Sequence, residues 1–367
     1  MNKREIVYLI LVVLGLCFNF QNSSIRIVLM LFWASLPFLI IIGSSSMKIE
    51  KRTLNYFYQL FFITCCLFFP FFYNSSSFEL ELSGASVEKL TPFIGFMTLP
   101  YFFIISNSAN YPTIHSRNLS IWLVVLFFLF EATYRYLKGP ELFMNYFDRH
   151  AAKTIGLLAT TNVNGQSLSV LFSCVLVINI KHKVKLLIVI FLLLLSAMAR
   201  AAIIAVILTT GLYLLANSKA IYRIIALSFS FVITTFFILD PLNLSSDGSL
   251  LSKLEFITST IAILKDADLA EIVFGFGLNY ESITNTLGVK GWSPHLPILK
   301  GFLYYGIFGI TYFVLSNLLI YRLNTKIFFP LLTYLILSFA GAPLFWPGLF
   351  SISLITLIPK DDYTNHR

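Results

Sequence analysis

Apolar segments of membrane-spanning length recur along the whole chain, and no other feature constrains its fold as strongly. A spanning helix needs about 20 mostly apolar residues, or about 17 when it is packed or tilted. Lipid offers no partners for backbone polar groups, so each segment must form a helix. The sequence therefore predicts an all-α polytopic membrane protein, one transmembrane domain over residues 1–367 with about twelve helices: 6–20, 27–43, 54–73, 91–106, 119–137, 157–179, 186–199, 201–216, 224–239, 297–320, 327–341 and 344–358.

The composition agrees with this prediction. Hydrophobic residues make up 57% of the chain and charged residues only 12%, whereas a soluble domain carries about 25% charged residues. Lipid must therefore be the solvent for most of the surface. The basic residues Lys3 and Arg4 before the first segment resemble a signal peptide, but no small-residue cleavage site follows, so we interpret that segment as the first span.

The positions of the basic residues predict the orientation, because Lys and Arg concentrate in cytoplasmic loops. With both termini in the cytoplasm, the cytoplasmic segments carry 15 basic and four acidic residues, which leaves 11 basic and 13 acidic residues elsewhere. The net charges are then +11 and −2. The net charge of +9 thus reflects topology and excludes nucleic acid as the partner. The cytoplasmic basic residues are Lys3, Arg4, Lys48, Lys51, Arg52, Arg117, Lys181, Lys183, Lys185, Lys219, Arg223, Arg322, Lys326, Lys360 and Arg367.

The longest loop, residues 240–296 between the ninth and tenth spans, lies on the outer side in this topology. Long loops in compact proteins are usually functional, so we expect the site on the outer face. An amphipathic helix is predicted over 250–264, because its apolar residues recur at helical spacing. Its predicted apolar face consists of Leu251, Leu254, Ile257, Ile261 and Leu264.

Arg200 is the strongest candidate site residue, since it divides 31 otherwise apolar residues. A charge at helix-centre depth costs about 2.5–3.5 kcal/mol on insertion scales and marks ligand or ion pathways. The small residues around Arg200 would let an anion approach closely. The alternative is that Arg200 caps a tight hairpin at the outer interface and reaches to the lipid headgroups.

Two other groups on the outer side could join Arg200. His295 precedes the tenth span and could donate to a phosphate oxygen or act as a base; alternatively it packs beside Trp292. Arg149 precedes a polar stretch, Thr160–Ser167, that includes Asn164. Polar groups in an apolar segment need partners, so this stretch either bonds neighbouring helices or lines a water-filled cavity.

Glu131 and Arg135 are spaced to form an i,i+4 ion pair on the fifth span. No cysteine or histidine spacing typical of a metal site occurs, nor any nucleotide-binding motif. The four cysteines are interpreted as packing residues, and no metal or cofactor is expected. The remaining constellation is cationic and faces outward. Because arginine binds phosphate oxygens in pairs, the residues favour a lipid-linked phosphate or pyrophosphate as the ligand.

These residues resemble the O-antigen polymerase and O-antigen ligase superfamily of bacterial inner membranes. Four features carry the resemblance: Arg149 with Gly156 and Asn164, the short hairpin around Arg200, the long loop with Lys253 and Phe274-Gly275-Phe276-Gly277, and His295 followed by Gly306 and Gly309. The chain departs from the family at Leu296, where ligases usually have a polar residue, and at Lys253, where arginine is common.

The resemblance implies a metal-independent glycosyltransferase in the inner membrane with its active site facing the periplasm. A polymerase transfers the growing glycan from undecaprenyl pyrophosphate to the next lipid-linked repeat unit. The alternatives are a ligase that transfers polymer to the lipid A-core and, in another class, a flippase for lipid-linked oligosaccharide. A protein that regulates chain length is a possible partner by family.

The resemblance and the chemistry together assign roles to individual residues. Arg200, His295 and Arg149 are expected to be catalytic, with the arginines on the pyrophosphate. The residues expected to contact the substrate are Lys253, Asn164, Glu131, Gly306 and Gly309.

Overall fold

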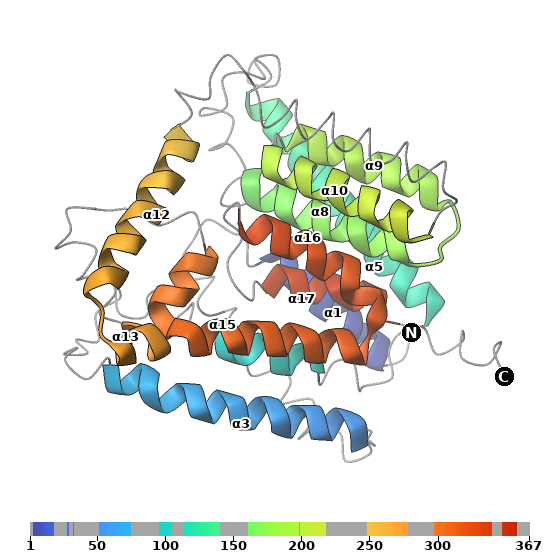
Figure 1. The fold of residues 1–367 in the computed structure, drawn as a ribbon. Helices are drawn as coiled ribbons and strands as arrows, with labels where there is room; N and C mark the ends of the chain where they lie inside the picture. Colours follow the sequence, from blue (N-terminus) through green and yellow to red (C-terminus); the bar gives the residue numbers. More distant parts are fainter. Residues whose placement is uncertain are drawn as a thin grey trace.

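The computed structural model is helical in every element that it describes. It describes residues 3–17, 28, 32, 51–74, 95–104, 113–139, 161–197, 199–217, 248–277, 297–339 and 347–357. Within these residues there is no β-strand. The helices form one layered bundle, and α12 (Gly248–Asp266) stands across its left-hand end (Figure 1).

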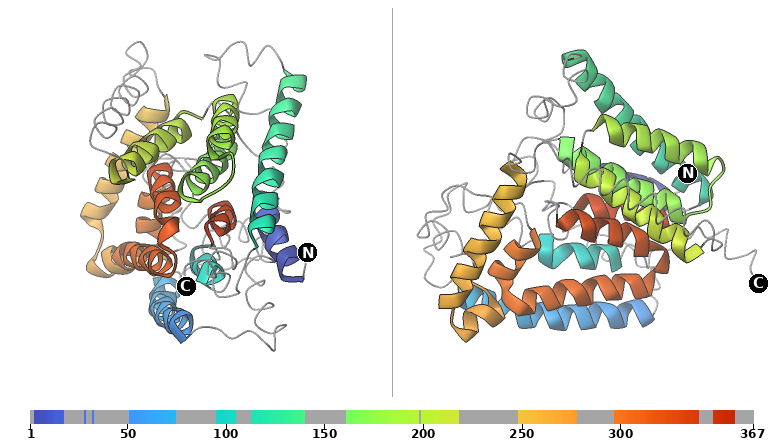
Figure 2. Two further views of the ribbon diagram at one scale, coloured as in Figure 1. Left: turned by 90° about the vertical axis from the view of Figure 1, so that its right-hand side faces the viewer. Right: turned by 45° about the horizontal axis from the view of Figure 1, so that its top comes forward.

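The bundle is built from helices at both ends of the chain. Its helices are α1 (Lys3–Cys17), α3 (Lys51–Asn74), α5 (Ile114–Lys138), α8 (Thr161–Val177), α9 (Lys183–Ser196), α10 (Arg200–Asn217), α15 (Pro297–Leu323), α16 (Phe328–Ser338) and α17 (Pro347–Ser353), with a further helix at Gly95–Ile104. The short 3-10 helices η2 (Thr325–Ile327) and η3 (Leu354–Thr356) extend α16 and α17. Viewed along the bundle, α3 lies beyond α15 on one side and the α9–α10 hairpin lies on the other (Figure 2).

Three of these helices are long and apolar enough to cross a membrane: Ile114–Lys138, Arg200–Asn217 and Gly301–Leu323. Every segment predicted to span contains a described helix, except 27–43, of which only Val28 and Phe32 are described, and 224–239. The protein is therefore a helical membrane protein. Twelve spans and their orientation stay predictions.

Basic side chains at one end of the bundle, here called the basic end, cap the carboxyl ends of helices. Arg117 donates to the carbonyl of Asn179 at 3.0 Å, just beyond α8, and Lys183 donates to Leu176 O in the last turn of α8. On the other side of the bundle, Arg52 donates to Arg322 O at 2.9 Å near the end of α15. Cations suit this position because the last carbonyls of a helix lack partners and carry its negative dipole end.

A node of hydroxyl groups joins three helices in the core. Thr333 Oγ1 on α16 lies 2.5 Å from Ser173 Oγ on α8 and 2.9 Å from Thr209 Oγ1 on α10. All three side chains are fully buried. Because lipid gives helices little hydrophobic reason to associate, such bonds and close packing hold a membrane bundle together.

Thr333→Val should remove both bonds at constant shape and lower the free energy of unfolding by about 0.6–1.7 kcal/mol. Thr311→Val is the matched control, since Thr311 is exposed and its hydroxyl only donates to Ile307 O of its own helix. Thermal unfolding in detergent compares the two variants. Equal midpoints for both would show that the node contributes nothing.

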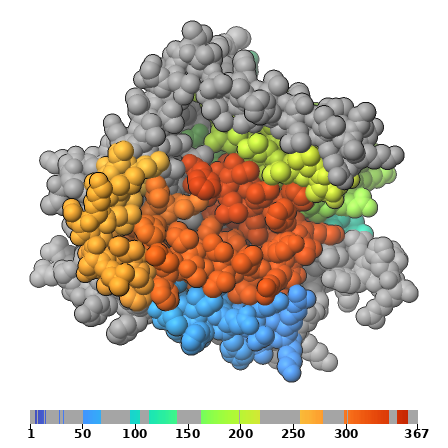
Figure 3. Space-filling view, viewed as in Figure 1, coloured from blue at the N-terminus to red at the C-terminus, as the bar shows by residue number. Residues whose placement is uncertain are grey.

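The helices at the other end of the bundle, called the loop end, are α12 (Gly248–Asp266) and α13 (Leu269–Phe274). Both belong to the predicted long loop, and α12 lies against the flank of α15 (Figure 3). The predicted helix at 250–264 is confirmed, but only part of its predicted apolar face is buried: Leu264 packs against the core, and the side chains of Leu251 and Leu254 lie outside the described residues. Ile257 and Ile261 are 37% and 50% exposed, whereas Phe256, Thr260 and Ile263 are buried. Helical spacing is satisfied by both faces, and packing of Phe256 and Ile263 into the core selects the second.

Candidate functional site

The loop end brings together the end of α5, the start of α8 and the break between α9 and α10. Gly165 on α8 makes the close approach possible, because a Cβ there would lie 3.1 Å from the Cβ of Ala202 and nearer still to that of Ala199. The small residues around Arg200 therefore pack a hairpin tightly onto α8. Any wider residue at Gly165 would push the hairpin away.

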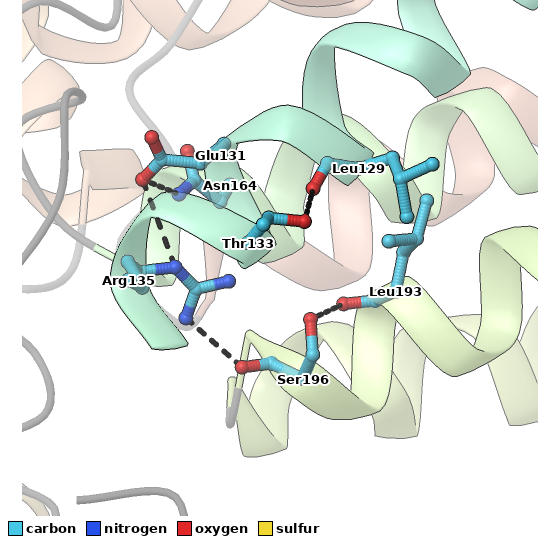
Figure 4. A network of polar contacts seen from close by, with 7 residues as sticks. All are labelled: Leu129, Glu131, Thr133, Arg135, Asn164, Leu193 and Ser196. Atoms are coloured by element: carbon cyan, nitrogen blue, oxygen red, sulfur yellow. Dashed lines mark hydrogen bonds and ion pairs between the residues drawn. The ribbon is translucent and has the colours of Figure 1, made fainter. Parts of the chain in front are cut away.

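A buried polar network lies at this junction (Figure 4). Glu131 Oε1 is 3.7 Å from Arg135 Nε and accepts a hydrogen bond from Asn164 Nδ2 at 3.2 Å. Arg135 Nη1 donates to the carbonyl of Ser196, the last residue of α9, at 2.9 Å. The predicted i,i+4 ion pair between Glu131 and Arg135 is thus confirmed. The network links α5, α8 and α9.

The network is electrically balanced and shielded from solvent. Glu131 is completely buried, Asn164 is 1% exposed and Arg135 is 5% exposed. The guanidinium of Arg135 lies between a carboxylate and a helix carboxyl end, and both favour a positive charge. A buried ion pair needs such additional bonds to offset the cost of desolvating its charges.

Two residues of the polar stretch at the start of α8 have hydrogen-bond partners within the protein. Asn164 bonds to α5 through Glu131, and Ser167 Oγ donates to Val163 O of its own helix. Gln166 is buried, and Asn162 is exposed at the first turn. Of the two alternatives for this stretch, bonding to a neighbouring helix accounts for Asn164.

Arg200 is half-buried and is the first residue of α10. The predicted hairpin is confirmed, and the charge lies at a helix end rather than within a continuous helix. Position and charge combine here, because the amino end of a helix attracts anions through its free amides and its dipole. A guanidinium at this end adds a planar pair of donors that fits phosphate oxygens.

The structure describes only some of the other predicted site residues. Arg149 and His295 lie outside the described residues. Lys253 falls within α12, but its side chain is outside the described part. Gly306 and Gly309 lie in α15, where Gly306 forms a kink with φ 63° and ψ −158°. The structure therefore brings Glu131 and Asn164 into contact, places Arg200 at the start of α10, and places Gly306 and Gly309 on another helix.

Sequence reasoning missed the contact of Arg135 with Ser196 and the part played by Gly165. Arg135 was recognised only as the ion-pair partner of Glu131, although its five donors can serve two partners. A glycine flanked by Asn164 and Gln166, opposite an Ala-rich hairpin, was the available signal for close helix packing.

No protein-family model matches the sequence, and no curated protein or solved structure matches it either. The chemistry must therefore be argued from the residues. In the described ranges no group of three or more His, Cys, Asp or Glu side chains could hold a metal ion. What the loop end offers is a cation at a helix amino end, together with a buried and electrically balanced network, and a cation at that position is suited to binding an anion.

Proposed function

We propose that the protein is an O-antigen polymerase, a membrane glycosyltransferase that joins lipid-linked oligosaccharide repeat units. In this proposal it lies in the bacterial inner membrane with the loop end facing the periplasm. The donor is a growing glycan on undecaprenyl pyrophosphate, and the acceptor is the next lipid-linked repeat unit. The resemblance of the sequence to the polymerase and ligase superfamily supplies the reaction.

The observation that carries the proposal is the position of Arg200. It begins a helix long and apolar enough to cross a membrane, at the same end of the bundle as α12 and α13 of the long loop (Figure 1). A lipid-linked pyrophosphate presents its charge at the membrane edge, beside the headgroups. The guanidinium and the amino end of α10 would meet it there.

The contacts between helix ends support the predicted sidedness. The alternating topology places Arg52, Arg117, Asn179 and Arg322 all in the cytoplasm, and these residues pair at the basic end. It also places the starts of the first and fifth spans on one side, and Thr113 donates to Glu5 Oε1 at 2.8 Å there. Lys and Arg gather at cytoplasmic ends, so the loop end is the outer end in this proposal.

In the proposed reaction, the acceptor hydroxyl attacks the anomeric carbon of the donor glycan and loses its proton. The bond to undecaprenyl pyrophosphate breaks, and the leaving pyrophosphate takes the electron pair. Arg200 and Arg149 would stabilise the charge growing on the leaving group, and His295 would orient or deprotonate the acceptor hydroxyl. Holding both substrates in line supplies the rest of the rate enhancement.

Reconstitution tests the proposal directly. The purified protein in nanodiscs receives lipid-linked repeat units extracted from its native host after deletion of the gene. We expect a ladder of lipid-linked oligomers that persists in EDTA, because the chemistry needs no metal. Absence of oligomers with a folded protein and intact substrate would contradict the proposal, and loss in EDTA alone would contradict its metal independence.

A further inference from the structure

Two glycines far apart in the sequence, Gly275 after α13 and Gly306 within α15, lie against each other's backbone. A Cβ on Gly275 would stand 2.5 Å from the carbonyl carbon and oxygen of Tyr304 and from the amide nitrogen of Tyr305. Real Cβ atoms do not approach backbone so closely. The loop segment after α13 therefore touches α15 directly, backbone to backbone.

The contact is reciprocal at Gly306. A Cβ there would stand 2.5 Å from the amide nitrogen of Gly275 and from the carbonyl carbon of Val273. Both glycines also have positive φ, 79° at Gly275 and 63° at Gly306, a region that side chains other than glycine's strongly disfavour. Each position thus requires glycine for two independent reasons.

One hydrogen bond closes this contact. The amide of Phe276 donates to the carbonyl of Leu303 at 2.8 Å. In a continuous helix that carbonyl would accept from the amide of Ile307, but the non-helical dihedrals of Gly306 interrupt the helical ladder there. The loop segment supplies the donor that the kink removes, so docking and kink stabilise each other.

Neighbouring side chains fix the docked segment. The capping box of Asp268 and Glu271 defines the start of α13, and the rings of Phe274 and Phe308 lie 5.3 Å apart. α13 also packs on α3. We call the contact of Val273–Phe276 with Leu303–Gly306 the glycine clasp.

The clasp divides α15 into two parts. The candidate membrane-crossing helix, Gly301–Leu323, contains the kink: residues 307–323 run along the bundle, while residues 297–305 form an arm with a different direction (Figure 1). The arm begins two residues after His295 in the sequence. The docked loop segment contacts the last residues of the arm, so it fixes the direction of the arm.

We propose that Gly275 and Gly306 are positioning residues for the transfer reaction: the clasp holds the arm at one fixed angle to the rest of α15 and to the docked end of the long loop. This inference rests on the proposed function. It assigns the direction of the arm to the long loop, and it gives Gly306 a role through α15 instead of a contact with the substrate.

The clasp itself is tested without any assay of activity. In a chain whose four native cysteines are replaced by alanine, Phe276→Cys reports on the clasp, because Phe276 is only 6% exposed. A water-soluble maleimide should label it slowly in membranes. Gly306→Ala or Gly275→Ala should raise the labelling rate about tenfold or more, whereas Gly139→Ala should not, since Gly139 has φ −160° and needs no glycine. Unchanged labelling in both clasp variants would overturn the clasp.

The positioning role is tested by kinetics in nanodiscs with the extracted lipid-linked repeat units. A misplacement of about 1 Å can cost about 100-fold in rate, so Gly306→Ala should lower kcat by about that factor and leave KM within about twofold. A merely unfolded fraction would label quickly in proportion to its size and lower the amount of active protein, but it would leave kcat per folded protein and its pH profile unchanged. Raised labelling with an unchanged kcat would overturn the positioning role.

If Gly306→Ala does not fold, a second variant tests whether the clasp stays closed during the reaction. Phe276→Cys with Leu303→Cys puts two thiols where the backbones are hydrogen-bonded, and a disulfide forms when the Cα atoms are about 4.4–6.8 Å apart. The oxidised protein should retain full kcat, because the clasp stays closed during turnover. Loss of activity on oxidation with recovery on reduction would overturn a fixed clasp. If the wild-type protein makes no oligomers, the proposed function fails, and the labelling result still stands by itself.

Discussion

Arg200→Ala should reduce polymer formation by about 100- to 1,000-fold, the range found when one preorganised donor to a developing negative charge is removed. The guanidinium begins α10, where the helix amino end already favours an anion. Its removal takes away the paired donors to the leaving pyrophosphate. The readout is the lipopolysaccharide ladder of a deletion strain complemented with the variant, beside an immunoblot of its membranes.

Two variants give this prediction its control. Arg200→Lys keeps the charge and loses the paired donors, so it should retain a partial ladder. Lys138→Ala removes an exposed cation at the same end of the bundle, in the last turn of α5, and should leave the ladder intact. A normal ladder from well-expressed Arg200→Ala would remove Arg200 from the site.

Glu131→Ala should destabilise the protein by about 3–5 kcal/mol, because it leaves the buried guanidinium of Arg135 beside no carboxylate. The carboxylate is fully buried and holds both Arg135 and Asn164. We expect a small amount of this variant in membranes and a lowered midpoint of thermal unfolding. Glu131→Gln should lose less, since an amide can still accept from Asn164.

The double variant Glu131→Leu, Arg135→Met separates structure from substrate binding. Replacing a buried ion pair with apolar residues of similar volume is often neutral, so the amount of protein should return toward the wild-type level. If Glu131 serves only the network, the ladder returns with it, which is the result we expect from its burial. A well-folded double variant without a ladder would show that Glu131 or Arg135 contacts the substrate, as the sequence analysis expected for Glu131.

The sequence predicted the helices well and their contacts poorly. Apolar length located α5, α10 and α15, because backbone satisfaction in lipid allows nothing else. Amphipathic spacing located α12 but not its buried face, since Ile257 and Phe256 offer alternative faces and only tertiary packing decides between them. The spacing of apolar residues identifies a helix, but it does not show which other helix packs against it.

At the site too, local contacts could be predicted from the sequence and long-range contacts could not. The pair Glu131–Arg135 follows from i,i+4 spacing alone, and the structure has it. The bonds of these residues to Asn164 and Ser196, 33 and 61 positions along the chain, depend on how α5, α8 and α9 pack. The contact between Gly275 and Gly306 was equally out of reach, although each glycine stood in a motif. Sequence motifs identified the candidate residues, but the contacts of those residues depend on the tertiary structure.

The central claim is that this protein polymerises lipid-linked repeat units at its loop end. Deleting its gene in the native host and running the lipopolysaccharide on a gel tests that claim most directly. The account predicts loss of the ladder with one band remaining, the core bearing a single repeat unit, since export and ligation still operate. A bare core would point to a ligase or flippase instead, and an unchanged ladder would contradict the assignment to this family altogether.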